Sequence, residues 1–84
     1  MEAVREFRDI PRWVAESYIL ELQGSTQTDA GFNGPDWEIT IDELSPVPVG
    51  FLSFRRIRIA VRGAPERVHA IWRELAPKFY RGGA

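Results

Sequence analysis

The chain has 84 residues, with 11 basic and 12 acidic side chains, one histidine and no cysteine. Its length fits a single domain over residues 1–84. The lack of cysteine excludes disulfides and thiolate metal sites. A formal net charge of −1 argues against a general electrostatic attraction to nucleic acid or to an anionic membrane. No apolar run approaches the roughly 20 residues of a membrane-spanning helix, and the first residues lack the apolar segment of a signal peptide. We therefore expect a cytoplasmic protein without nucleic-acid or membrane partners.

The first elements are predicted to be a short strand over residues 3–8 and a helix over residues 11–24. A proline at the start and a glycine at the end bound the helix, and Val14, Tyr18 and Leu22 recur every four residues. The stretch from Tyr18 to Leu22 also has the aromatic and β-branched composition of a strand. The bounding residues favour the helix over this alternative.

Alternating polar and apolar residues predict the strands in the middle of the chain. A short strand is expected at 29–33, and longer half-buried strands at 37–44 and 54–62. The segment 45–50 between them is interpreted as a turn or an edge, because neither of its prolines can donate to a sheet. The apolar residues before Arg55 are out of phase with those after it, which indicates a bend or bulge there. The side chains expected to face the core are Trp37, Ile39, Ile41, Ile57, Ile59 and Val61.

A helix beginning at Pro65 is the clearest element, because its apolar residues follow the spacing of a one-sided helix. Pro65 suits the first helical position, and Pro77 is expected to disrupt the last turn. His69 falls on the polar face. The apolar residues of this helix are Val68, Ile71, Trp72, Leu75 and Phe79. The element order is then β-α-β-β-β-β-α.

Three stretches of the sequence are similar to one protein family. They are FRDIPRWV at 7–14 followed by Tyr18, VGFLSF at 49–54 with IRIAVRG at 57–63, and the ending RGG at 81–83. They resemble the C-terminal domain of MoaD-related proteins, where it follows a ubiquitin-like module similar to the small subunit of molybdopterin synthase. The resemblance spans nearly the whole chain and contains no catalytic signature.

This resemblance implies an α+β fold of the TBP-like type. In that fold, β-α-β(4)-α, one antiparallel sheet carries two helices packed on one face, in agreement with the order read from the residues. The resemblance brings no activity with it. We expect the 84 residues to lack the ubiquitin-like module, which puts a link to molybdopterin or sulfur transfer in doubt.

Arg56, Arg58 and Arg62 form an outward row on the second long strand. Guanidinium groups in such a row can bind a phosphate, a carboxylate or an RNA backbone. Alternatively, Glu38 and Asp42 have the same spacing on the neighbouring strand, where cross-strand pairs of opposite charge stabilise a sheet modestly. The charge-paired surface is the favoured interpretation. The acidic residues on this face also argue against a TBP-like nucleic-acid saddle.

No catalytic, cofactor-binding or metal-ligating set is predicted. His69 is expected to be exposed and without a catalytic partner, and no serine or threonine has a recognisable activating base. The loop at 29–36 departs from the calcium-loop pattern and is interpreted as a hairpin connection. The diglycine at 82–83 is reminiscent of sulfur-carrier tails, but a frayed terminus is favoured.

The aromatic content exceeds what so small a core is expected to bury, and Trp13, Phe79 and Tyr80 are the candidates for an interaction surface. We therefore expect a non-enzymatic accessory or protein-interaction domain that forms a homo-oligomer or binds a protein partner. The alternative is a small-molecule binder that holds an apolar or anionic ligand, with Arg58 or Arg62 as the polar anchor. It requires a cavity of at least about 300 Å³.

Overall fold

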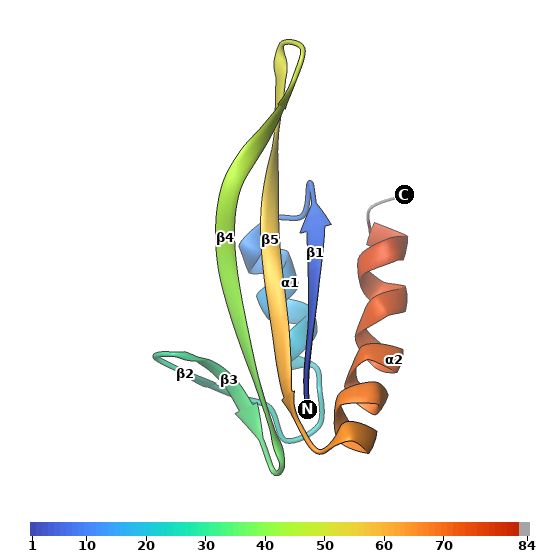
Figure 1. Ribbon diagram of the computed structural model, residues 1–84. Coiled ribbons are helices and arrows are strands. Elements are labelled where there is room, and N and C mark those ends of the chain that lie inside the picture. The colour runs from blue at the N-terminus through green and yellow to red at the C-terminus, as the bar shows by residue number, and fades with distance from the viewer. Residues whose placement is uncertain (83–84) are drawn as a thin grey trace.

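The computed structural model describes residues 1–82, which form one antiparallel sheet and two helices (Figure 1). The elements are β1 (Glu2–Arg8), α1 (Arg12–Leu20), β2 (Thr26–Thr28), β3 (Gly31–Gly34), β4 (Trp37–Val49), β5 (Leu52–Gly63) and α2 (Pro65–Gly82). The strands lie in the order β1-β5-β4-β3-β2. This architecture confirms the predicted α+β class and the β-α-β(4)-α order.

The long ladder between β4 and β5 separates an apolar face from a polar one. Ile39 lies opposite Val61 and Ile41 opposite Ile59 on the buried face. Figure 1 shows α1 behind this ladder and α2 beside β1. One core holds the inward side chains of the sheet together with those of both helices. The alternation in the sequence therefore identified the core residues of these two strands correctly.

The first helix is confirmed, and the strand alternative at residues 18–22 is excluded. Ala15 and Ile19 are buried on its inner face. The helix ends at Leu20, before the expected end at Gly24. The chain leaves the helix through tight turns, in which the amide of Leu22 donates to the carbonyl of Ile19 and the amide of Ser25 donates to that of Leu22.

Two strands were predicted imperfectly. The single strand expected at 29–33 is a hairpin of β2 and β3, whose short pairing carries only a weak sequence signal. Of the two interpretations of residues 45–50, the turn is wrong and the edge is confirmed, since β4 continues to Val49. Its prolines are tolerated because β3 pairs with β4 only as far as Ile39, which leaves the β4 edge open beyond that point. The turn consists of Gly50 and Phe51, where Gly50 adopts a φ of 60° that favours glycine.

The expected irregularity near Arg55 is present, but its one extra residue lies on the other strand. The register shifts between Leu44 and Val47 of β4, directly across from Arg55. The alternation of β5 itself continues through this point, so the phase break in its sequence reflects a change in which face carries the apolar residues.

The second helix follows its predicted face but does not stop at Pro77. It continues to Gly82, because Pro77 lies on the exposed side and Phe79 beyond it is buried. A proline removes one helical hydrogen bond, and burial of the following aromatic ring compensates for it.

Ile19 and Leu20 provide a test of this packing, since they are neighbours on α1 with 0% and 47% exposure. Ile19→Ala should lower the free energy of unfolding by about 2–5 kcal/mol, because it leaves a cavity in the core. Leu20→Ala should change it by less than about 0.5 kcal/mol. Urea denaturation of both variants measures the difference, and equal effects would contradict the packing of α1.

Candidate functional site

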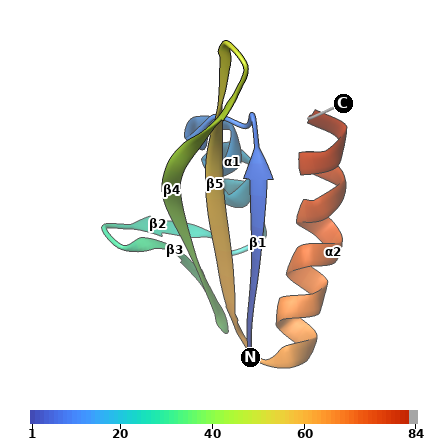
Figure 2. The ribbon, with the colours of Figure 1, turned by 45° about the horizontal axis from the view of Figure 1, so that its top comes forward.

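The β4–β5 hairpin projects beyond the rest of the molecule as a two-stranded arm (Figures 1 and 2). Pairing of β1 with β5 ends where Arg8 lies opposite Arg56, so no third strand supports the hairpin past that point. The molecule is correspondingly elongated, with extents of 44 × 26 × 21 Å. We call residues 45–54 the arm. None of these residues is charged.

The arm has one apolar face and an apolar tip. Val47 lies opposite Phe54 and Val49 opposite Leu52, so these four side chains share a face. Val49 is 52% exposed, Leu52 is 62% exposed, and Phe51 in the turn is fully exposed at 109% of its reference area. Contiguous exposed apolar residues of this kind mark interaction sites in soluble proteins.

The β4 edge of the arm is poorly suited to receive an added strand. Pro46 and Pro48 lie on β4, where the edge is open, and neither can donate a backbone hydrogen bond. Prolines on an edge strand block pairing with other chains. A partner of the arm is therefore not expected to extend the sheet from the β4 edge, and the exposed side chains of the arm are the other surface that it can contact.

Two of the three aromatics predicted for an interaction surface are exposed, and the third is not. Trp13 is 71% exposed and Tyr80 62% exposed. Phe79 was placed on that surface wrongly, because it is 1% exposed. Its ring stacks on Phe7 with centroids 4.5 Å apart and meets Tyr18 edge-on at 5.4 Å. The helical spacing that carries Phe79 inward was visible in the sequence.

A groove of about 250 Å³ lies near the base of the arm. It is lined by Asp9, Ile10, Pro11, Val14, Tyr18 and Phe79. The amide of Asp9 donates to the carbonyl of Arg55 at 2.8 Å, which fixes this end of the groove beside the start of the arm. The groove brings together residues from the β1–α1 connection, α1 and α2. We call it the base groove.

The arginine row pairs with acidic residues on the outward face of the sheet. Arg58 contacts Asp42 at 3.6 Å, and Arg56 contacts Glu6 at 3.7 Å. These contacts agree with the favoured charge-paired interpretation, whereas anion binding by the row stays a prediction.

Arg62 is held between two carboxylates on neighbouring strands. Its Nε donates to Glu2 at 2.6 Å and its Nη1 to Glu38 at 3.4 Å. The hydrogen bond from Arg62 to Glu2 raises the pKa of this guanidinium above its already high ordinary value. Arg62 is therefore positively charged at any physiological pH.

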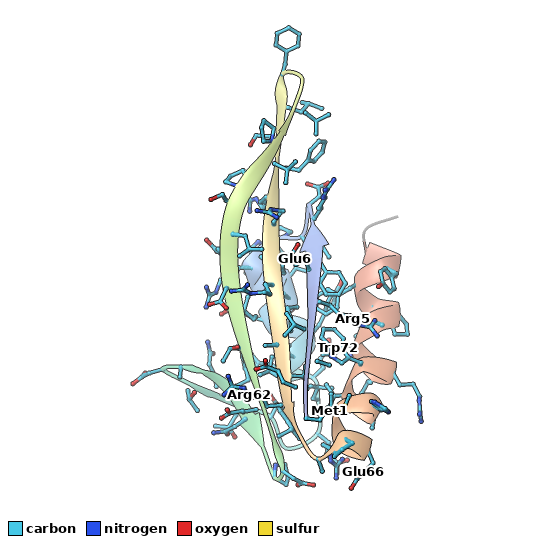
Figure 3. All side chains as sticks on the ribbon, viewed as in Figure 1. Met1, Arg5, Glu6, Arg62, Glu66 and Trp72 are labelled. Atoms are coloured by element: carbon cyan, nitrogen blue, oxygen red, sulfur yellow. The ribbon has the colours of Figure 1, made fainter. Side chains whose placement is uncertain are left out.

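A second, more open groove of about 500 Å³ lies between β1 and α2. The guanidinium of Arg5 lies 4.8 Å from the ring centroid of Trp72, and the two side chains approach each other between these elements in Figure 3. His69 and Arg73 also line the groove, which has no carboxylate among its lining residues. We call it the edge groove. His69 is exposed, as expected.

Sequence reasoning missed the arm and the edge groove for different reasons. The uncharged run of the arm was visible but was interpreted as a turn or an edge. Arg5 was assigned no role, although its register opposite Ile59 places it on the inward side of the edge strand.

The described residues add two findings on metals and membranes. Within residues 1–82, no group of three histidine, aspartate or glutamate side chains is placed to hold a metal ion. In the same part of the chain, neither helix is long and apolar enough to cross a membrane. The predicted frayed end at the diglycine lies partly outside the described residues, which stop at Gly82.

A family model for archaeal MoaD-like proteins matches residues 3–84. The chain belongs to this family. Membership confirms the MoaD-related resemblance of the sequence and links this MoaD-like chain to the sulfur-carrier proteins of the MoaD group. No curated protein matches the chain.

The charge-paired face of this MoaD-like chain can be tested at Arg58 and Asp42. A double-mutant cycle of Arg58→Gln and Asp42→Asn should give a coupling free energy of about 0.2–1 kcal/mol, because both side chains are exposed. The coupling should shrink further in about 1 M salt. Thermal or urea unfolding measures it, and a coupling that salt does not change would contradict a solvent-exposed pair.

Proposed function

We propose that this MoaD-like chain is a non-enzymatic protein-interaction domain that self-associates through the arm. The observation that carries the proposal is the fully exposed Phe51 at the tip of the uncharged arm. A phenylalanine left in water forfeits about 1.5–3 kcal/mol that burial would supply. Its neighbours Val49 and Leu52 add to the same exposed surface.

The arm is suited to a second copy of itself. A face built from two cross-strand apolar pairs, Val47 with Phe54 and Val49 with Leu52, is complementary to an identical face rotated by a two-fold axis. The arm carries no charge, so two arms meet without electrostatic repulsion. The outward face of the body is rich in charges that are already paired. This face is therefore less suited than the arm to an apolar contact with a second copy.

The arm can be tested with the double variant Phe51→Ser, Leu52→Ser. Burial of each of these side chains supplies about 1.5–3 kcal/mol, and every 1.4 kcal/mol is tenfold in affinity. Self-association should therefore weaken by about 100-fold or more. Sedimentation velocity over a range of concentrations measures it, and circular dichroism should show an unchanged fold because both residues are exposed.

Val4→Ser is the matched control, because Val4 is a 46% exposed apolar residue on the outward face of the body. It should leave self-association unchanged. A native protein that stays monomeric at every concentration, or a double variant that associates as the native protein does, would contradict the proposal.

A second candidate function is binding of a small anionic molecule in the edge groove. The supporting observation is that Arg5, His69 and Arg73 line about 500 Å³ of open space without a lining carboxylate. Guanidinium groups match carboxylate and phosphate oxygens. The candidate differs from the sequence-based version, in which Arg58 or Arg62 was the anchor. Those two side chains are paired with carboxylates on the opposite face of the sheet.

Thermal shift with inorganic phosphate and with acetate tests this candidate. Ligand binding to the folded state should raise the melting temperature of the native protein. Arg73→Gln should abolish most of the shift, because it removes a groove cation, while Arg58→Gln should retain it. Equal shifts in both variants would show that phosphate acts on the protein generally rather than in the edge groove.

A further inference from the structure

We infer that two copies pair their arms antiparallel about a two-fold axis, and that the Phe51 ring of each copy occupies the base groove of the other. The inference rests on the self-association proposed above and names its partner surface. The arm supplies the apolar side chains, and the base groove supplies a site that a ring can enter.

The positions of the arm and the base groove favour this arrangement. The groove begins at Asp9, which is bonded to Arg55 where the arm starts. Two hairpins that lie side by side in opposite directions place each tip beside the start of the other. A single two-fold operation therefore brings both tips to both base grooves, and the contacts are reciprocal.

The arm cannot reach the groove of its own chain. The strands are paired from Val47 opposite Phe54 to Val49 opposite Leu52, so the arm is a continuous ladder that extends away from the body. About five residues at roughly 3.3 Å each separate the start of the arm from its tip. The tip is thus held well away from Asp9 of the same chain.

The base groove is large enough for a phenyl ring and offers it apolar and aromatic contacts. An apolar cavity of about 150 Å³ accepts benzene, and the base groove has about 250 Å³. Five of its six lining residues are apolar or aromatic, and Asp9 is the only one with a charge. The ring of Tyr18 and the buried ring of Phe79 offer aromatic contacts to an entering ring.

The area required for a stable dimer also favours the groove. Stable interfaces bury about 1,200–2,000 Å² in total, and one aromatic side chain supplies on the order of 200 Å². Contact between the two tips alone falls short of this range. Insertion of each ring into the groove adds the lining of two grooves to the contact between the arms.

Cross-linking between single-cysteine variants tests the inference, because the native chain has no cysteine. Leu52→Cys places a thiol at the tip while Phe51 is kept, and Val14→Cys places one in the base groove. A short bismaleimide should link the two variants to each other when they are mixed. Neither variant alone should give a linked dimer.

The outcomes separate this inference from the proposed function. Linkage of Leu52→Cys to itself, or an arm-dependent dimer that gives no mixed linkage, overturns the insertion of the tip but leaves self-association intact. A native protein that remains monomeric overturns both.

Filling the groove provides a second measurement. Val14→Phe occupies the space intended for the ring of the other copy and should weaken dimerisation at least tenfold. Leu20→Phe adds the same side chain to an exposed position of the same helix and should have no effect. Unchanged dimerisation of a folded Val14→Phe protein overturns the inference.

Discussion

The antiparallel ladder between β4 and β5 is the constraint on which the rest of the molecule depends. Its inward side chains, such as Ile39 and Val61, form the sheet side of the core that both helices cover. Its outward side chains, such as Glu38 and Arg62, form ion pairs. The strands on either side pair with only part of this ladder, and the part left over is the arm. One pair of strands thus determines the core, the charged face and the candidate interaction surface.

Local sequence patterns predicted most of the helices and strands outside the arm, because the spacing of apolar residues there matches the side on which each element is buried. The alternation around Ile59 and the helical spacing around Leu75 reflect residues that are buried on one side only. The prolines at 46 and 48 left a turn and an edge equally open, since a proline ends a central strand but not an open edge. Whether an edge is open depends on where β3 stops, which no local pattern reveals. The predicted irregularity near Arg55 coincides with the bulge, but the extra residue lies in β4, whose own sequence pattern did not indicate it.

The candidate site was harder to predict because exposure is a property of the whole fold. Trp13, Phe79 and Tyr80 were chosen for their size. In the structure Trp13 and Tyr80 lie on the exposed sides of their helices, whereas Phe79 lies on a buried side. Phe79 shares the helical face of Leu75 and is buried with it. The arm was the stronger signal, since residues 45–54 lack any charge although they include turn-forming residues. An uncharged segment that cannot fold back into the core must be exposed in the isolated chain.

The arm combines an exposed apolar face with a β4 edge that resists pairing. In the proposed dimer, this combination limits association. An open edge with free amide donors can add strands from one chain after another. Pro46 and Pro48 remove donors from the β4 edge of the arm, so at that edge the apolar side chains remain the means of contact. In the proposed dimer, the two-fold axis uses each arm and each base groove once, and a closed set of contacts leaves no unfilled site for a third copy. A chain that exposes Phe51 can therefore associate strongly and still stop at two copies.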